Sequence, residues 1–185
     1  MDTTTKPIRD VETLLAELEA AGSREAIGRT LARIEFGLEA LQPFLHFDPT
    51  FYTRNLLRRT PDFELIALCW EPGQATPIHD HDDSDGWVVG MSGSVEEVRY
   101  RPKDSREEGV EFERLGSTEV TPGAVAHIHD DIAVHEIRND GAERAVSLHL
   151  YAPPIDECRG YDSKSGRWVT RRMRYHTIEG APASS

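Results

Sequence analysis

The chain has 185 residues, 38% of them hydrophobic and 29% charged, and its 33 acidic against 21 basic residues give a formal net charge of −12. This length predicts a single domain spanning residues 1–185. So acidic a chain is expected to bind neither nucleic acid nor an anionic membrane, because both attract Lys and Arg.

The first part of the chain, residues 10–43, has the pattern of amphipathic helices. Asp10 and Ser23 are candidate N-caps of two successive helices. In the second, apolar residues recur every three or four positions over 27–41, and Pro43 ends the pattern. We predict a helix pair that packs on the domain's own core; the alternative is a coiled coil with a partner.

Residues 50–176 change to short β-type runs separated by turn residues. The predicted strands are Phe63–Trp70, Gly86–Met91, Ser94–Tyr100, Val110–Leu115, Ala133–Arg138, Ala145–Tyr151 and Arg167–Tyr175. This density of strands predicts a mainly β fold, a sandwich or barrel with an N-terminal helical cap. The last residues, 177–185, are expected to form a flexible tail.

The chain has only two cysteines, Cys69 and Cys158, too few for a disulfide framework. Its N-terminus lacks the apolar stretch of a secretory signal, and no apolar run approaches the ~18 residues of a membrane-spanning helix. We therefore expect a cytoplasmic monomer with two reduced thiols.

Histidines are the main candidates for chemistry. His79 and His81 are two positions apart, and on a strand such residues project to the same face, so both imidazoles can point into one cavity. Two residues compete as a third ligand. His127 lies five residues after Pro122, whereas His135 lies in an alternating apolar segment. Spacing alone leaves this choice open.

The spacing of Gly73, His79, His81, Gly86 and Gly93 resembles the first sequence motif of the cupin superfamily. The resemblance implies a cupin-type β-barrel, or jelly roll. One position departs from the motif, because Gly86 stands where glutamate is usual. Without that carboxylate, a metal site here is expected to hold three neutral imidazoles, whose uncompensated dication suits an anionic ligand such as a thiolate.

Four segments in order resemble the bacterial cysteine dioxygenases, which are thiol dioxygenases of the cupin superfamily. They are Tyr52–Asn55, His79–Ser84, His135–Asn139 and Ser147–Pro154. The resemblance implies an enzyme that converts L-cysteine and O2 to cysteine sulfinate. It also implies an Fe(II) ion held by His79, His81 and His135, which selects His135 over His127.

The same resemblance assigns residues to the substrate. Arg54 is expected to bind the substrate carboxylate, with Tyr52 beside it in the substrate site. Tyr151, His149 and Ser147 are expected to form a catalytic relay next to the iron. Their alternation agrees, because positions 147, 149 and 151 of a strand share one face and can form a hydrogen-bonded row.

Two alternatives stay open. The enzyme could oxidise another small thiol, 3-mercaptopropionate or cysteamine, although related 3-mercaptopropionate dioxygenases carry glutamine where Arg54 stands. The chain could also be a non-catalytic metal-binding cupin, although pure binding does not require a relay. In animal members a cysteine is cross-linked to the active-site tyrosine; the corresponding position here is Gly86, so we expect Tyr151 to keep a free phenol.

Overall fold

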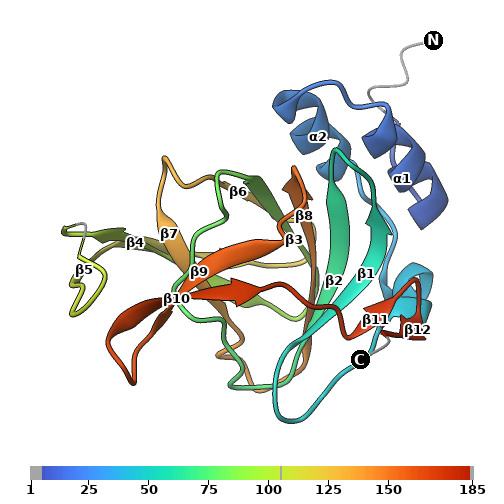
Figure 1. Ribbon diagram of the computed structural model, residues 1–185. Helices are drawn as coiled ribbons and strands as arrows, with labels where there is room; N and C mark the ends of the chain where they lie inside the picture. Colours follow the sequence, from blue (N-terminus) through green and yellow to red (C-terminus); the bar gives the residue numbers. More distant parts are fainter. Residues whose placement is uncertain (1–5, 105, 184–185) are drawn as a thin grey trace.

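The structure, a computed structural model, describes residues 6–104 and 106–183 and consists of N-terminal helices followed by β-strands (Figure 1). The helices are α1 (Val11–Glu19), α2 (Arg24–Leu31) and the 3-10 helix η2 (Leu38–Phe44). The strands are β1 (Thr53–Arg59), β2 (Glu64–Trp70), β3 (Asp85–Ser92), β4 (Val95–Pro102), β5 (Phe112–Val120), β6 (Val125–Ile128), β7 (Val134–Arg138), β8 (Ala145–Ala152), β9 (Glu157–Asp162), β10 (Arg167–Arg172), β11 (Thr177–Ile178) and β12 (Ala181–Pro182). No helix in these described ranges is long and apolar enough to cross a membrane.

The strands form three sheets. The largest has seven strands in the order β12-β11-β1-β2-β8-β3-β6, the second has the order β5-β4-β7, and β9 pairs with β10 in a hairpin. Figure 1 shows α1 and α2 beside β1 and β2, with β4, β5 and β7 on the opposite side of the molecule. The mainly β fold with a helical cap is therefore as predicted from the sequence.

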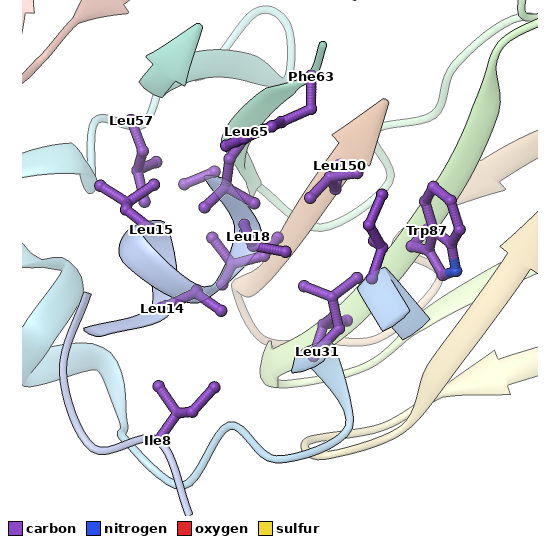
Figure 2. Close-up of a cluster of buried hydrophobic side chains, with 14 of the residues drawn as sticks. Ile8, Leu14, Leu15, Leu18, Leu31, Leu57, Phe63, Leu65, Trp87 and Leu150 are labelled. Carbon is purple, nitrogen blue, oxygen red and sulfur yellow. The ribbon is translucent and has the colours of Figure 1, made fainter. Parts of the chain in front are cut away.

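The large sheet is covered on both faces, which explains why every residue of β2 is buried. Side chains of a strand alternate between faces. Leu65 of β2 and Leu150 of β8 therefore point toward the helices, where they pack with Leu14, Leu18 and other helical residues (Figure 2). This cluster attaches the helical cap to the outer face of the sheet.

The opposite face of the large sheet points into the barrel. Ile66 and Leu68 of β2 pack there with Val95 of β4 and Ile137 of β7 in a second buried cluster. Because Ser147, His149 and Tyr151 alternate with Leu148 and Leu150, they project from β8 into this same interior. The alternation of β8 thus separates its packing residues from its polar residues.

The N-terminal region contains both predicted caps but not the predicted long second helix. The side chains of Asp10 and Ser23 accept the N–H groups of Thr13 and Ala26. The expectation of one helix over 27–41 is wrong, because α2 ends at Leu31. Residues 33–35 instead pair with Ile8 through two backbone hydrogen bonds of 2.8 Å, and this extended pairing replaces the helical turn.

The predicted flexible tail is wrong for residues 177–182, which form β11 and β12. Strand β11 runs parallel to β1, and Thr177 is buried with its hydroxyl donating to Oδ1 of Asn55 at 2.9 Å. The buried amide of Asn55 thus gains a partner that keeps this segment on the sheet. Residues 184–185 lie outside the described residues.

Candidate metal centre

Three imidazoles meet in the barrel interior. His79, His81 and His135 each offer a ring nitrogen, and these nitrogens lie within 4.8 Å of one another. Nε2 of His81 and Nε2 of His135 are 3.1 Å apart. His81 and His135 are buried, and His79 is half-buried. The structure thus brings together the three histidines expected as ligands, and the protein has a candidate metal site.

Backbone pairing holds these histidines in place. His79 and His135 exchange two hydrogen bonds, from His79 N to His135 O at 2.9 Å and from His135 N to His79 O at 3.1 Å. The N–H of His81 donates to Oδ1 of Asp130 at 2.8 Å. Between His79 and His81, the buried carboxylate of Asp80 accepts the N–H and the Nε–H of Arg159 from β9. The segment is therefore anchored on both sides.

This anchoring corrects one expectation from the sequence. His79 and His81 do not lie on a strand, because His79 forms an isolated bridge and His81 precedes the turn at Asp82 and Asp83. Their side chains converge nevertheless, because β7 and β9 pair with the segment from either side.

The outward nitrogens of two rings have acceptors. Nδ1 of His79 lies 3.0 Å from the carbonyl oxygen of Pro77, and Nδ1 of His135 lies 2.8 Å from Oε1 of Glu97. In these two rings Nδ1 therefore carries the proton, and the lone pair of Nε2 points inward. Burial lowers the pKa of His81 and of His135 well below the ordinary value, which favours neutral rings. Inward lone pairs on neutral imidazoles are suitable ligands for a cation, so the site fits a divalent metal.

Sequence reasoning missed the carboxylate behind His135. Glu97 is fully buried, and its Oε2 accepts Nε–H and Nη2–H of Arg99 at 3.0 and 2.8 Å. Burial raises the pKa of Glu97, and the hydrogen bonds from Arg99 act in the opposite direction. A signal was available in the sequence, because Glu97 is two positions after Val95 and so shares its inward face.

The three residues expected as a relay form a hydrogen-bonded row. The Ser147 hydroxyl lies 2.8 Å from Nε2 of His149, and Nδ1 of His149 lies 3.2 Å from the hydroxyl of Tyr151. Nε1 of Trp70 donates to Ser147 at 3.0 Å. Burial lowers the pKa of His149 well below its ordinary value and raises that of Tyr151 well above its own. Both side chains are therefore neutral near pH 7.

A cavity of about 200 Å³ is lined by His79 and His81 of the cluster and by His149 and Tyr151 of the row on β8. Pockets for drug-sized ligands measure about 300–1,000 Å³, so this cavity suits a smaller molecule. Its lining includes the side chains expected to contact a substrate and others on the barrel wall: Tyr52, Arg54, His79, His81, His149, Tyr151, Ile155, Cys158, Arg171 and Met173. Burial raises the pKa of the Cys158 thiol to about 11.

Arg54 presents free donors in this cavity. Its Nε and Nη2 are buried and have no hydrogen-bond acceptor among the described residues. These two nitrogens form one edge of the guanidinium fork, which matches the two oxygens of a carboxylate. Tyr52 lies nearby and stacks on Trp70, with ring centroids 4.8 Å apart. The cavity thus has a place for an anionic group.

The structure also shows the surroundings of Gly86, which replaces the usual glutamate of the motif, and of His127, the other candidate for the third ligand. Gly86 pairs directly with Tyr151 across β3 and β8, and a Cβ there would lie 2.9 Å from Cε1 of His81. Glycine therefore leaves room for the His81 ring and offers no sulfur to Tyr151. His127 lies on β6 outside the cluster, with Nε2 2.8 Å from Oδ1 of Asp85.

Comparisons with known proteins bear on this site. The sequence model of the family described as cysteine dioxygenase type I matches residues 31–164. The rat protein named cysteine dioxygenase type 1 is 33% identical over 173 residues, covering 92% of this chain and 79% of its own. The human protein of that name is 32% identical over 139 residues, covering 74% of this chain and 68% of its own.

A solved structure supports the fold alone. It is an uncharacterised protein with a double-stranded β-helix domain from Klebsiella pneumoniae. It aligns with a TM-score of 0.51 at 17% identity, covering 71% of this chain and 87% of its own. The architecture of this chain is therefore that of the cupin-type barrel.

Proposed function

The chain belongs to the cysteine dioxygenase type I family, and from this premise we propose that it is an iron-dependent enzyme that converts L-cysteine and O2 to cysteine sulfinate. The observation that carries the proposal is the convergence of His79, His81 and His135 next to a cavity that His79 and His81 share with Arg54. The reaction balances without a further reductant. The sulfur loses four electrons, O2 gains four, and both oxygen atoms end on sulfur.

Iron is the metal that the family and the reaction call for. His79, His81 and His135 would hold Fe(II) through Nε2, because Nδ1 of His79 and of His135 is already engaged. When bound, Fe(II) supplies a redox-active cation for the chemistry of O2 and a thiolate. Imidazole ligands also suit zinc, copper and nickel, so the metal must be identified by analysis.

The remaining residues bind and orient the substrate. Arg54 receives the carboxylate of L-cysteine on its Nε and Nη2 edge, since both donors lack an acceptor in the described protein. Tyr52 closes the wall beside Arg54. This places the substrate thiol toward the histidine cluster, because His79 and His81 line the same small cavity as Arg54.

The row on β8 directs the phenol of Tyr151. Indole Nε1–H only donates, so Ser147 accepts from Trp70 and directs its own O–H to Nε2 of His149. Nδ1–H of His149 then donates to the Tyr151 oxygen, and the phenol proton is free to point into the cavity. Tyr151 thus offers a hydrogen bond to the reacting group while its raised pKa keeps it protonated.

We also keep the expectations of a monomer and of a cytoplasmic location as proposals. Cys69 and Cys158 are both free and buried, which fits a reducing compartment. Size-exclusion chromatography with light scattering would test the first, and fractionation of cells would test the second.

The test is product analysis with labelled oxygen. Protein loaded with Fe(II) without oxygen is mixed with L-cysteine and ¹⁸O₂, and the sulfinate is expected to carry two labelled atoms. His135→Ala should lose metal and activity, whereas His127→Ala, the matched control outside the cluster, should keep both. Oxygen uptake without sulfinate from L-cysteine, 3-mercaptopropionate or cysteamine would contradict the proposal.

A further inference from the structure

A second buried charge lies beside Arg54. Glu64, the first residue of β2, is fully buried, and its Oε1 lies 3.5 Å from Nη2 of Arg54. The same oxygen accepts the N–H of Ile155 at 3.2 Å. A buried carboxylate this close to a guanidinium attracts it strongly, because little water screens the pair. Glu64 is therefore a potential competitor for the cation that would bind the substrate carboxylate.

The other oxygen of Glu64 has partners of its own. Nη1 of Arg59 lies 3.4 Å from Oε2 of Glu64, and these residues are direct partners across β1 and β2. The hydroxyl of Tyr175 donates to Oε2, and Nη1 of Arg59 donates to that hydroxyl at 2.7 Å. Arg59 also pairs with Asp156 at 2.7 Å, but the Asp156 side chain is 86% exposed and well screened. Arg59 and Tyr175 thus contact Oε2 of Glu64, whereas Arg54 lies near Oε1.

The hydrogen bonding of Arg54 agrees with this arrangement. Although Nη2 lies 3.5 Å from Glu64, it makes no hydrogen bond to it or to any other described residue, and neither does Nε. The guanidinium carbon instead lies 5.8 and 5.9 Å from the ring centroids of Tyr151 and Tyr175. The donors of Arg54 therefore stay available although a carboxylate is near.

We propose that Arg59 is a specificity-determining residue for this enzyme. Together with Tyr175 it balances the charge of Glu64, and this leaves the Arg54 guanidinium free to bind a substrate carboxylate. The proposal rests on the function proposed above, in which that carboxylate belongs to L-cysteine. Without Arg59, Glu64 draws Arg54 from its present 3.5 Å contact into a hydrogen-bonded ion pair, and thiols with a carboxylate lose affinity while thiols without one do not.

The test compares ligands that differ in one charged group. KM is measured for L-cysteine, and inhibition constants are measured for 3-mercaptopropionate, which has a carboxylate, and for cysteamine, which has none. Arg59→Gln is expected to raise KM for L-cysteine and the inhibition constant of 3-mercaptopropionate about tenfold, which corresponds to roughly 1.4 kcal/mol. The inhibition constant of cysteamine should change less than twofold. Arg59→Gln/Glu64→Gln should return to within about threefold of wild type, because the competing charge is gone.

Two further variants separate this effect from damage to the fold. Arg58→Gln is the matched control, because Arg58 is the neighbour of Arg59 on β1 but pairs with Glu19 of α1 at 3.6 Å; its constants should be unchanged. Tyr175→Phe removes the proton donated to Glu64 and should act in the same direction as Arg59→Gln.

The possible results are distinct. An unchanged KM and unchanged inhibition in Arg59→Gln and Tyr175→Phe would overturn the inference. So would an equal loss of cysteamine binding, or a double variant no better than Arg59→Gln alone. Wild-type protein that forms no sulfinate would instead reject the proposed function, and the inference with it.

Discussion

Glu97 should control how tightly the protein binds its metal, and Glu97→Gln tests this. In the wild type, Oε1 accepts from Nδ1 of His135 while Oε2 accepts from Arg99. A glutamine has only one oxygen and cannot serve both partners. If its oxygen faces His135, its NH2 meets the donors of Arg99. If its NH2 faces His135, the proton of that ring moves to Nε2, the atom expected to bind metal.

The size of the effect follows from this conflict. Loss of a carboxylate that supports a ligating histidine typically lowers metal affinity about 10- to 100-fold. That range corresponds to about 1.4–2.7 kcal/mol. We expect a loss of affinity near the upper end of this range, because the hydrogen bonds from His135 and Arg99 to the Glu97 carboxylate are charge-assisted and Glu97 is fully buried.

The assay is a competition titration. Metal-free protein is titrated with Fe(II) against a chelator of known affinity without oxygen, and folding is checked by circular dichroism. Glu96→Gln is the matched control, because Glu96 is the neighbour on β4 but pairs with Arg138 on the surface; its affinity should stay within about twofold. A folded Glu97→Gln protein with the affinity of the wild type would refute the reasoning.

Three other measurements follow from the site. Arg54→Ala should raise KM for L-cysteine far more than it changes kcat, because hydrogen bonds to charged groups contribute about 1.5–3 kcal/mol; an unchanged KM would contradict its role. Tyr151→Phe should lower kcat by about 10- to 100-fold with KM within a few fold, because it removes a hydrogen bond to the reacting group; an unaltered kcat in steady-state product formation would contradict this role. Metal-free protein should lose stability to urea as the pH falls below 6.5. The pKa of buried His149 and that of His81 are lower in the folded protein than in the unfolded chain, so the unfolded chain is protonated first and is favoured. Each group adds up to about 1.4 kcal/mol per pH unit, and a flat profile from pH 7 to 5 would count against neutral buried rings.

The fold could be predicted where the residue pattern within a single strand or helix determines that element. Strict alternation on β8 places Leu148 and Leu150 on one face and His149 and Tyr151 on the other, whatever the partners are. The prediction of one helix over 27–41 was wrong because helical periodicity does not include the contact with Ile8. The backbone of Ile8 pairs with residues 33–35, and this pairing ends the helix. Contacts between distant segments decided that boundary.

The same limit applies to the site. Adjacent residues such as His79 and His81 can be identified from spacing, and the resemblance selected His135 over His127. The supporting residues could not be found in this way, because each acts across a strand pair. Glu64 meets Arg59 through the register of β1 and β2, and Glu97 meets His135 through the pairing of β4 and β7. Register depends on which strands pair and on the turn between them, so it cannot be read from the spacing within one strand.

The two supporting pairs explain how the cavity can select its ligand by charge. Glu97 lies against Arg99 and Glu64 against Arg59, so each buried carboxylate has a cation of its own. A glutamate at position 86 would instead place its charge directly on the metal. With glycine there, the charge of a bound divalent ion and that of Arg54 are both left to the ligand. A thiolate neutralises the charge of the ion and a carboxylate that of Arg54, and L-cysteine carries both groups on adjacent carbons. The selectivity for such a molecule thus depends on keeping the two internal carboxylates paired, and for this reason the charge of Arg59 matters although it lies outside the cavity lining.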